Sequence, residues 1–99
     1  MSALMTEVSH RWGTLFRQLE AGDDAPPSQR LRLEGLMEAL VISGESSAEK
    51  LQAEMDACYQ RVSGESFSAS LGEDWATVHP FPQIPAFMKR ASVYPSTRD

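Results

Sequence analysis

Apolar residues recur at helical spacing through the first two thirds of the chain. Between residues 3 and 21 the large apolar side chains all fall within an arc of about 120° at 100° per residue, which is typical of an amphipathic helix. These residues are Leu4, Met5, Val8, Trp12, Leu15, Phe16 and Leu19. Ser2 can cap the start of this segment, and Gly22 can end it. The pattern therefore predicts a helix over residues 3–21, with its apolar face buried.

Two more stretches repeat this pattern, over residues 28–43 and 47–63. The apolar face of the first consists of Leu33, Leu36, Met37, Leu40 and Val41. The face of the second consists of Ala48, Leu51, Met55, Cys58, Tyr59 and Val62. Residues 46–49 fit a capping box, in which Ser46 and Glu49 satisfy each other's backbone donors. The connections are short, so neighbouring helices should pack antiparallel.

The segment 28–43 also carries a second apolar stripe, made of Leu31, Gly35, Ala39 and Ile42. A glycine inside a helix costs about 1 kcal/mol relative to alanine, so a closely packed neighbour is one explanation for it. We therefore predict that this stripe is covered, either by the C-terminal segment or by a second copy of the chain. The alternative is a tolerated glycine beside two exposed aliphatic side chains.

The last third of the chain has a different composition, because residues 65–99 hold four of the six prolines and five of the eight aromatic residues. A second capping-box match at residues 70–73 predicts a short helix over 71–78. Residues 80–85 should be extended and polyproline-like. We divide the chain into a helical domain, residues 1–79, and a proline- and aromatic-rich arm, residues 80–99. The arm can either complete the core of the bundle or dock on a partner.

Composition and charge limit the class of protein. The chain has 99 residues and a formal net charge of −5, which fits one small acidic domain. The acidic balance disfavours wide contact with nucleic-acid phosphates. The longest apolar run, residues 39–42, is too short for a membrane span or a signal peptide. A single cysteine, Cys58, excludes an intramolecular disulfide. We expect a cytoplasmic protein with no membrane contact.

No residue spacing matches a catalytic, metal-binding or cofactor-binding motif. His10 falls on the polar face of the first helix, and His79 precedes a proline in a predicted loop. Cys58 lies in the middle of a helix, far from a helix N-terminus that could lower its pKa, so we interpret it as a buried structural thiol. The sequence therefore predicts no catalytic residues, no metal and no cofactor, and we expect that the protein is not an enzyme.

Together these patterns predict an all-α fold: a small bundle of three amphipathic helices, then a short helix or turn and an extended arm. The leading hypothesis is a non-catalytic interaction module, such as an adaptor, regulator or accessory subunit. Its predicted partner-binding residues belong to types enriched at interface cores or lie between them: Trp75, Phe81, Ile84, Phe87, Met88, Arg90 and Tyr94. The second helix stripe is the other candidate surface, with a protein partner or a homodimer in view.

Two alternatives remain. The segments 28–43 and 47–63 can be read as a helix-turn-helix of a DNA-binding regulator, although the would-be recognition helix carries Glu49, Glu54 and Asp56. A small enzyme or ligand carrier would need a pocket assembled between chains in an oligomer. A deep apolar pocket with His79 or Cys58 at its wall would favour that third class.

Overall fold

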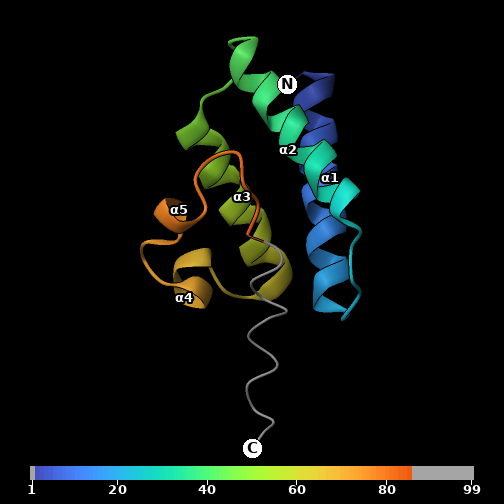
Figure 1. Ribbon diagram of the computed structural model, residues 1–99, viewed down its shortest axis with the longest axis vertical. Helices are drawn as coiled ribbons and strands as arrows, with labels where there is room; N and C mark the ends of the chain where they lie inside the picture. The colour runs from blue at the N-terminus through green and yellow to red at the C-terminus, as the bar shows by residue number, and fades with distance from the viewer. Residues whose placement is uncertain (1, 86–99) are drawn as a thin grey trace, which may run out of the picture.

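The computed structural model describes residues 2–85 of the chain, and these residues contain helices and no strand. The helices are α1 (Ala3–Glu20), α2 (Pro27–Ile42), α3 (Ala48–Ser63), α4 (Phe67–Leu71) and α5 (Trp75–Val78). Helices α1, α2 and α3 run alternately down, up and down in Figure 1, so neighbours in sequence are antiparallel, as predicted. Helix α1 contacts both α2 and α3. The predicted all-α bundle is confirmed.

The three long helices begin and end where local chemistry predicts. The Ser2 hydroxyl accepts a hydrogen bond from the Met5 backbone N–H at 3.0 Å, which caps α1. At the start of α3 the cap is Ser47, whose Oγ accepts from the Lys50 N–H at 3.1 Å. The prediction that Ser46 caps this helix was therefore wrong by one residue. Gly64 ends α3 with φ of 87°, a left-handed conformation that favours glycine.

The core lies where α1 meets α2 and α3, and it extends into the last third of the described chain. Trp12 and Phe16 are each 1% exposed, which confirms the predicted apolar face of α1. Phe16 packs edge-on against Tyr59, with ring centroids 5.3 Å apart. Phe67 stacks on Tyr59 at 4.4 Å and contacts Trp75 at 4.7 Å. These aromatic contacts hold α4 and α5 against α3.

The short helix predicted over residues 71–78 is confirmed only in its second half, because α5 ends at Val78 as predicted but begins at Trp75. Ser66 caps a separate helix, α4, by accepting from the Ala69 N–H at 3.1 Å. Gly72, with φ of 104°, interrupts the chain before α5. The hydroxyl of Ser70, the predicted cap, instead bonds the Glu65 carboxylate at 2.6 Å and the Tyr59 hydroxyl at 3.0 Å. The capping serine is therefore Ser66, one turn before the predicted Ser70, and α4 begins directly after it.

Residues 80–85 form a turn against the bundle and are not an extended polyproline segment, which corrects the sequence prediction. The Gln83 N–H donates to the Pro80 carbonyl at 2.9 Å, and the Phe81–Pro82 peptide bond is cis. Ile84 is fully buried. Its backbone N–H donates to the Glu34 carboxylate of α2 at 2.9 Å. Tertiary anchoring of Ile84 thus outweighs the local preference of the prolines for an extended chain.

Candidate functional site

The outer side of α2 carries the stripe predicted from the sequence, which we call the α2 outer face (Leu31, Gly35, Ala39 and Ile42). Leu31, Gly35 and Ile42 are exposed, and Ala39 is half-buried. Ile42 is 84% exposed and Leu31 is 56% exposed. Apart from its chain neighbours and the nearby backbone of α2 itself, a Cβ added at Gly35 would have no described atom within 4 Å. The described residues of the arm therefore do not cover this face. A larger side chain at Gly35 should therefore not clash with other parts of the same chain. That a second copy of the chain covers the α2 outer face stays a prediction.

The opposite side of α2 is fully buried, through Leu33, Met37 and Leu40. Apolar side chains therefore occupy two sides of α2, and the described bundle buries only one of these sides. Isolated exposed aliphatic side chains are normal on protein surfaces. Two aliphatic side chains flanking a glycine and an alanine on one helix face are a more specific arrangement, because small residues allow another backbone to approach closely.

The last third of the described chain supplies fewer exposed binding residues than the sequence predicts. Trp75 is 8% exposed and Ile84 is fully buried, so both belong to the core and neither can reach a partner while the bundle is folded. Phe81 is half-buried against the same core. Burial of these side chains fills a core that three helices alone leave incomplete. The other predicted binding residues, Phe87, Met88, Arg90 and Tyr94, lie outside the described residues.

Glu34 holds the arm in place, a role that the sequence does not reveal. Arg30, four residues earlier on α2, forms an ion pair with Glu34, with the guanidinium Nη1 3.0 Å from Oε2. The same oxygen also accepts the Ile84 N–H, across fifty positions of sequence. A carboxylate that accepts two hydrogen bonds in a mostly buried position is well satisfied. Only the tertiary fold brings these two segments together.

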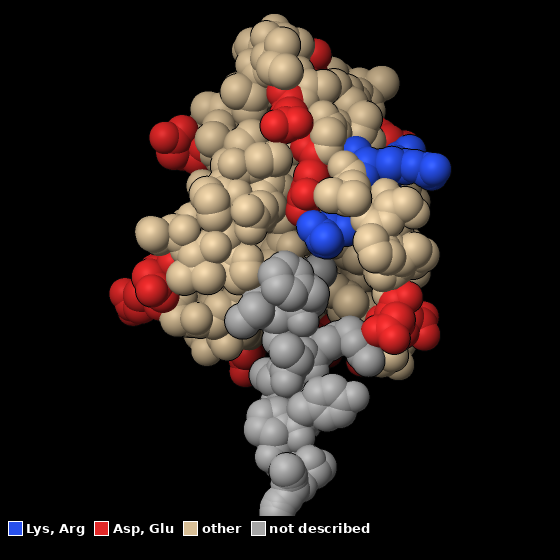
Figure 2. Space-filling model, viewed as in Figure 1, with Lys and Arg blue, Asp and Glu red and all other residues tan. Residues whose placement is uncertain are grey.

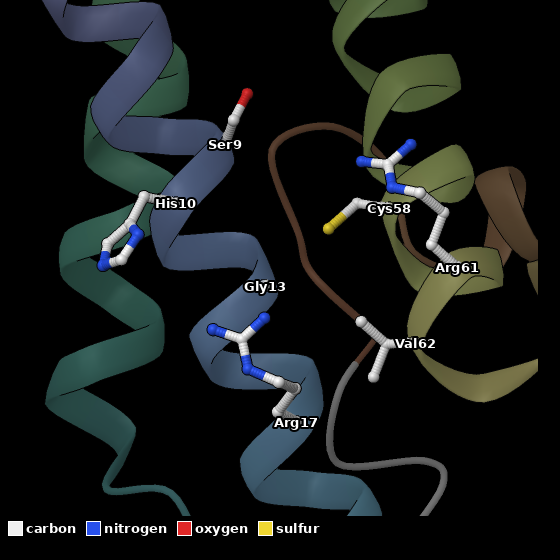
Figure 3. A pocket seen from close by; sticks show the side chains of 7 residues that line it. All are labelled: Ser9, His10, Gly13, Arg17, Cys58, Arg61 and Val62. Atoms are coloured by element: carbon white, nitrogen blue, oxygen red, sulfur yellow. The ribbon is translucent and has the colours of Figure 1, made fainter.

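A second feature is an open cleft between α1 and α3, with a volume of about 530 Å³. Figure 3 shows the side chains that line it, which are Ser9, His10, Gly13, Arg17, Cys58, Arg61 and Val62. No carboxylate is among them. The sulfur of Cys58 points from α3 toward α1, and the Arg17 guanidinium lies beside Gly13. Nothing in the spacing of these residues along the chain predicts the cleft, because they come from two helices.

The thiol of Cys58 is mostly buried at the wall of this cleft, 5% exposed. Burial raises its pKa above the usual value, and the nearby positive charges of Arg61 and Arg17 oppose this shift in part. The cleft is open and lined by cations, so it differs from the deep apolar pocket named above for a ligand carrier. His79 is buried elsewhere, and His10 is exposed as predicted.

Charged side chains on the face drawn in Figure 2 give little support to nucleic-acid binding. Acidic side chains are spread over several elements of this face, and the basic ones form only small groups. In the part of the chain that the structure describes, no group of three or more potential ligands could hold a metal ion. None of the helices described there is long and apolar enough to cross a membrane.

Comparisons with family models, with curated proteins and with solved structures give no match to this chain. The arguments for function therefore rest on the α2 outer face and on the cleft between α1 and α3.

Cys58 should react slowly with iodoacetamide at neutral pH in the folded protein and quickly in denaturant. Burial limits access of the reagent, and the raised pKa lowers the fraction of reactive thiolate. The rate should increase as the pH rises toward that pKa. Time courses followed by mass spectrometry, with the denatured protein as the reference, give both rates. Equal rates in the two states would contradict the assigned burial.

Proposed function

We propose that this protein is a non-catalytic interaction module, an adaptor, regulator or accessory subunit, and that its α2 outer face is a contact surface for a second copy. The observation that supports this most directly is the exposure of Ile42 and Leu31, 84% and 56%, on a helix whose opposite side is fully buried. Covering two such side chains removes apolar surface from water, which favours association.

The order of side-chain sizes along this face supports self-association. It runs large, small, small, large, from Leu31 through Gly35 and Ala39 to Ile42, so it is nearly the same in both directions. A two-fold axis near the centre of α2 would pair two antiparallel copies of the helix. Leu31 of each copy would then face Ile42 of the other, with the small residues at the crossing. Self-complementary surfaces of this kind generate closed dimers.

The expected dimer is weak. Stable interfaces bury about 1,200–2,000 Å² in total, and one pair of short helices reaches only the low end of that range. We therefore expect an equilibrium between monomer and dimer that shifts with concentration.

Sedimentation velocity over a wide concentration range tests the proposal. The wild-type average mass should rise with concentration, and Ile42→Asp should hold the chain monomeric. Val78→Asp is the matched control, because Val78 is 57% exposed and lies outside the α2 outer face. Gly35→Leu should fold with undiminished stability, since the space around Gly35 is open, yet associate less well. A wild-type protein that stays monomeric throughout would refute self-association.

Two further outcomes would also overturn the assignment. If Val78→Asp disrupts the dimer as strongly as Ile42→Asp, the contact lies elsewhere. If a DNA duplex shifts on a native gel and salt abolishes the shift, the DNA-binding alternative gains over the interaction module.

A further inference from the structure

The cleft between α1 and α3 collects positive charge in a chain whose formal net charge is −5. Arg11 and Arg30 each pair with a glutamate four residues away on the same helix. By contrast, Arg17 and Arg61 line the cleft, and neither forms an ion pair with a carboxylate of the described residues. The two guanidinium groups come from facing helices (Figure 3). Their attraction for an anion is therefore not cancelled by a described carboxylate.

Gly13 contributes to the position of Arg17. It is a buried glycine in the middle of α1, where glycine costs about 1 kcal/mol of stability relative to alanine. A Cβ at this position would lie 3.0 Å from Nη1 of Arg17, and the next two nearest atoms also belong to that guanidinium, at 3.7 Å. The missing side chain thus lets the guanidinium lie against the helix at the wall of the cleft, and a Cβ would make it shift by a few tenths of an ångström.

We propose that this cleft binds the phosphate monoester group of a small molecule, with Arg17 and Arg61 as its cationic ligands. A phosphate monoester carries about −1.5 to −2 charges and three acceptor oxygens, and a guanidinium group binds such oxygens through its fork of N–H donors. Ser9 also lines the cleft, at the end farther from Arg17 (Figure 3). The volume of about 530 Å³ exceeds what a phosphate group needs, and it falls in the range of small-ligand sites. Val62 offers an apolar surface for the carbon portion.

This site is independent of the α2 outer face, because it lies between the other two long helices. Cys58 also provides a way to detect a bound ligand. The thiol is at the cleft wall, where the charges of Arg61 and Arg17 reach it. A ligand bound beside it would further limit access to the sulfur. The alkylation rate of Cys58 therefore reports occupancy of the cleft without any assumption about catalysis.

Phenyl phosphate titrated into the full-length protein, followed by NMR chemical shifts, tests the proposal. We expect saturable shifts at residues of the cleft. Arg17→Gln and Arg61→Gln should each weaken binding at least tenfold. Arg32→Gln is the matched control, because it removes the same charge from α2, outside the cleft. Benzoate, which carries a single negative charge on the same ring, should bind at least tenfold more weakly than phenyl phosphate.

The Gly13→Ala variant distinguishes an effect on the position of the Arg17 guanidinium from an effect on the stability of the fold. Alanine should preserve or raise the melting temperature through its helix propensity, yet weaken binding of phenyl phosphate by displacing the Arg17 guanidinium. Phenyl phosphate should also slow alkylation of Cys58 by iodoacetamide in the wild type and not in Arg17→Gln. The proposal fails if millimolar phenyl phosphate causes no saturable shift, if Arg32→Gln weakens binding as much as Arg17→Gln, or if benzoate binds equally well.

Discussion

Replacing Trp12 by alanine should lower the free energy of unfolding by about 3–5 kcal/mol, the range seen for large aromatic deletions in protein cores. Trp12 is 1% exposed and lies in α1, the helix that contacts both α2 and α3. Removal of the indole therefore leaves a cavity at the centre of the bundle. A loss of this size is a large part of the total stability of a small domain, which is about 5–15 kcal/mol.

The Trp12→Phe variant distinguishes the effect of losing the volume of the aromatic ring from the effect of losing the indole N–H. The indole Nε1 is buried with no hydrogen-bond partner among the described residues. A buried donor without an acceptor is destabilising, so the phenyl ring should recover much of the stability that alanine loses. Urea unfolding followed by circular dichroism gives both values. Val78→Ala serves as the control, since Val78 is 57% exposed and should change stability by less than about 0.5 kcal/mol. A Trp12→Ala protein that melts within two or three degrees of the parent would contradict the core assignment.

The three long helices could be predicted from the sequence because their signals are local. Apolar periodicity identifies the buried face, and caps such as Ser2 and Gly64 mark the ends. For α2, the prediction over 28–43 and the observed Pro27–Ile42 differ by one residue at each end. These signals depend on neighbours within one or two turns, so no tertiary information is needed to interpret them.

The end of the described chain could not be predicted in this way, because distant contacts determine it. The Glu34 carboxylate holds the Ile84 N–H, and neither residue has a local feature that indicates the other. In the segment before it, Ser66 and Ser70 both precede plausible helix starts. The contacts of Ser70 with Glu65 and Tyr59 favour the earlier cap, and Tyr59 belongs to a different helix.

The two candidate sites also differ in whether local sequence signals or distant contacts define them. The α2 outer face lies on one helix, so spacing alone identified Leu31, Gly35, Ala39 and Ile42. The cleft needs residues of α1 and α3 together, and its existence depends on how these helices pack. One local signal was available, a glycine four residues before an arginine within α1. Gly13 and Gly35 look alike in the sequence, since each lies within a helix, and only the packing of α1 shows the Arg17 guanidinium beside Gly13.

Two truncations should differ in their effect on stability. Deleting residues 80–99 removes Ile84, which is fully buried, together with its hydrogen bond to Glu34. The free energy of unfolding should fall by at least about 2–5 kcal/mol, the cost of emptying one large aliphatic site in a core. Deleting residues 86–99 removes none of the described core residues, so the melting temperature should stay close to that of the parent.

This pair also separates the two roles that the sequence left open for the arm. Phe87, Met88, Arg90 and Tyr94 are absent from both truncated chains, whereas Ile84 is absent only from the shorter one. If residues 86–99 carry the predicted partner-binding surface, their deletion should abolish capture of a partner while the thermal melt is preserved. Thermal melts and affinity capture on the same preparations provide the comparison. Equal destabilisation by both truncations would show that Ile84 is not the anchor, because the longer chain retains it. Capture that persists without residues 86–99 would place binding on the helices, with the α2 outer face as the surface to mutate.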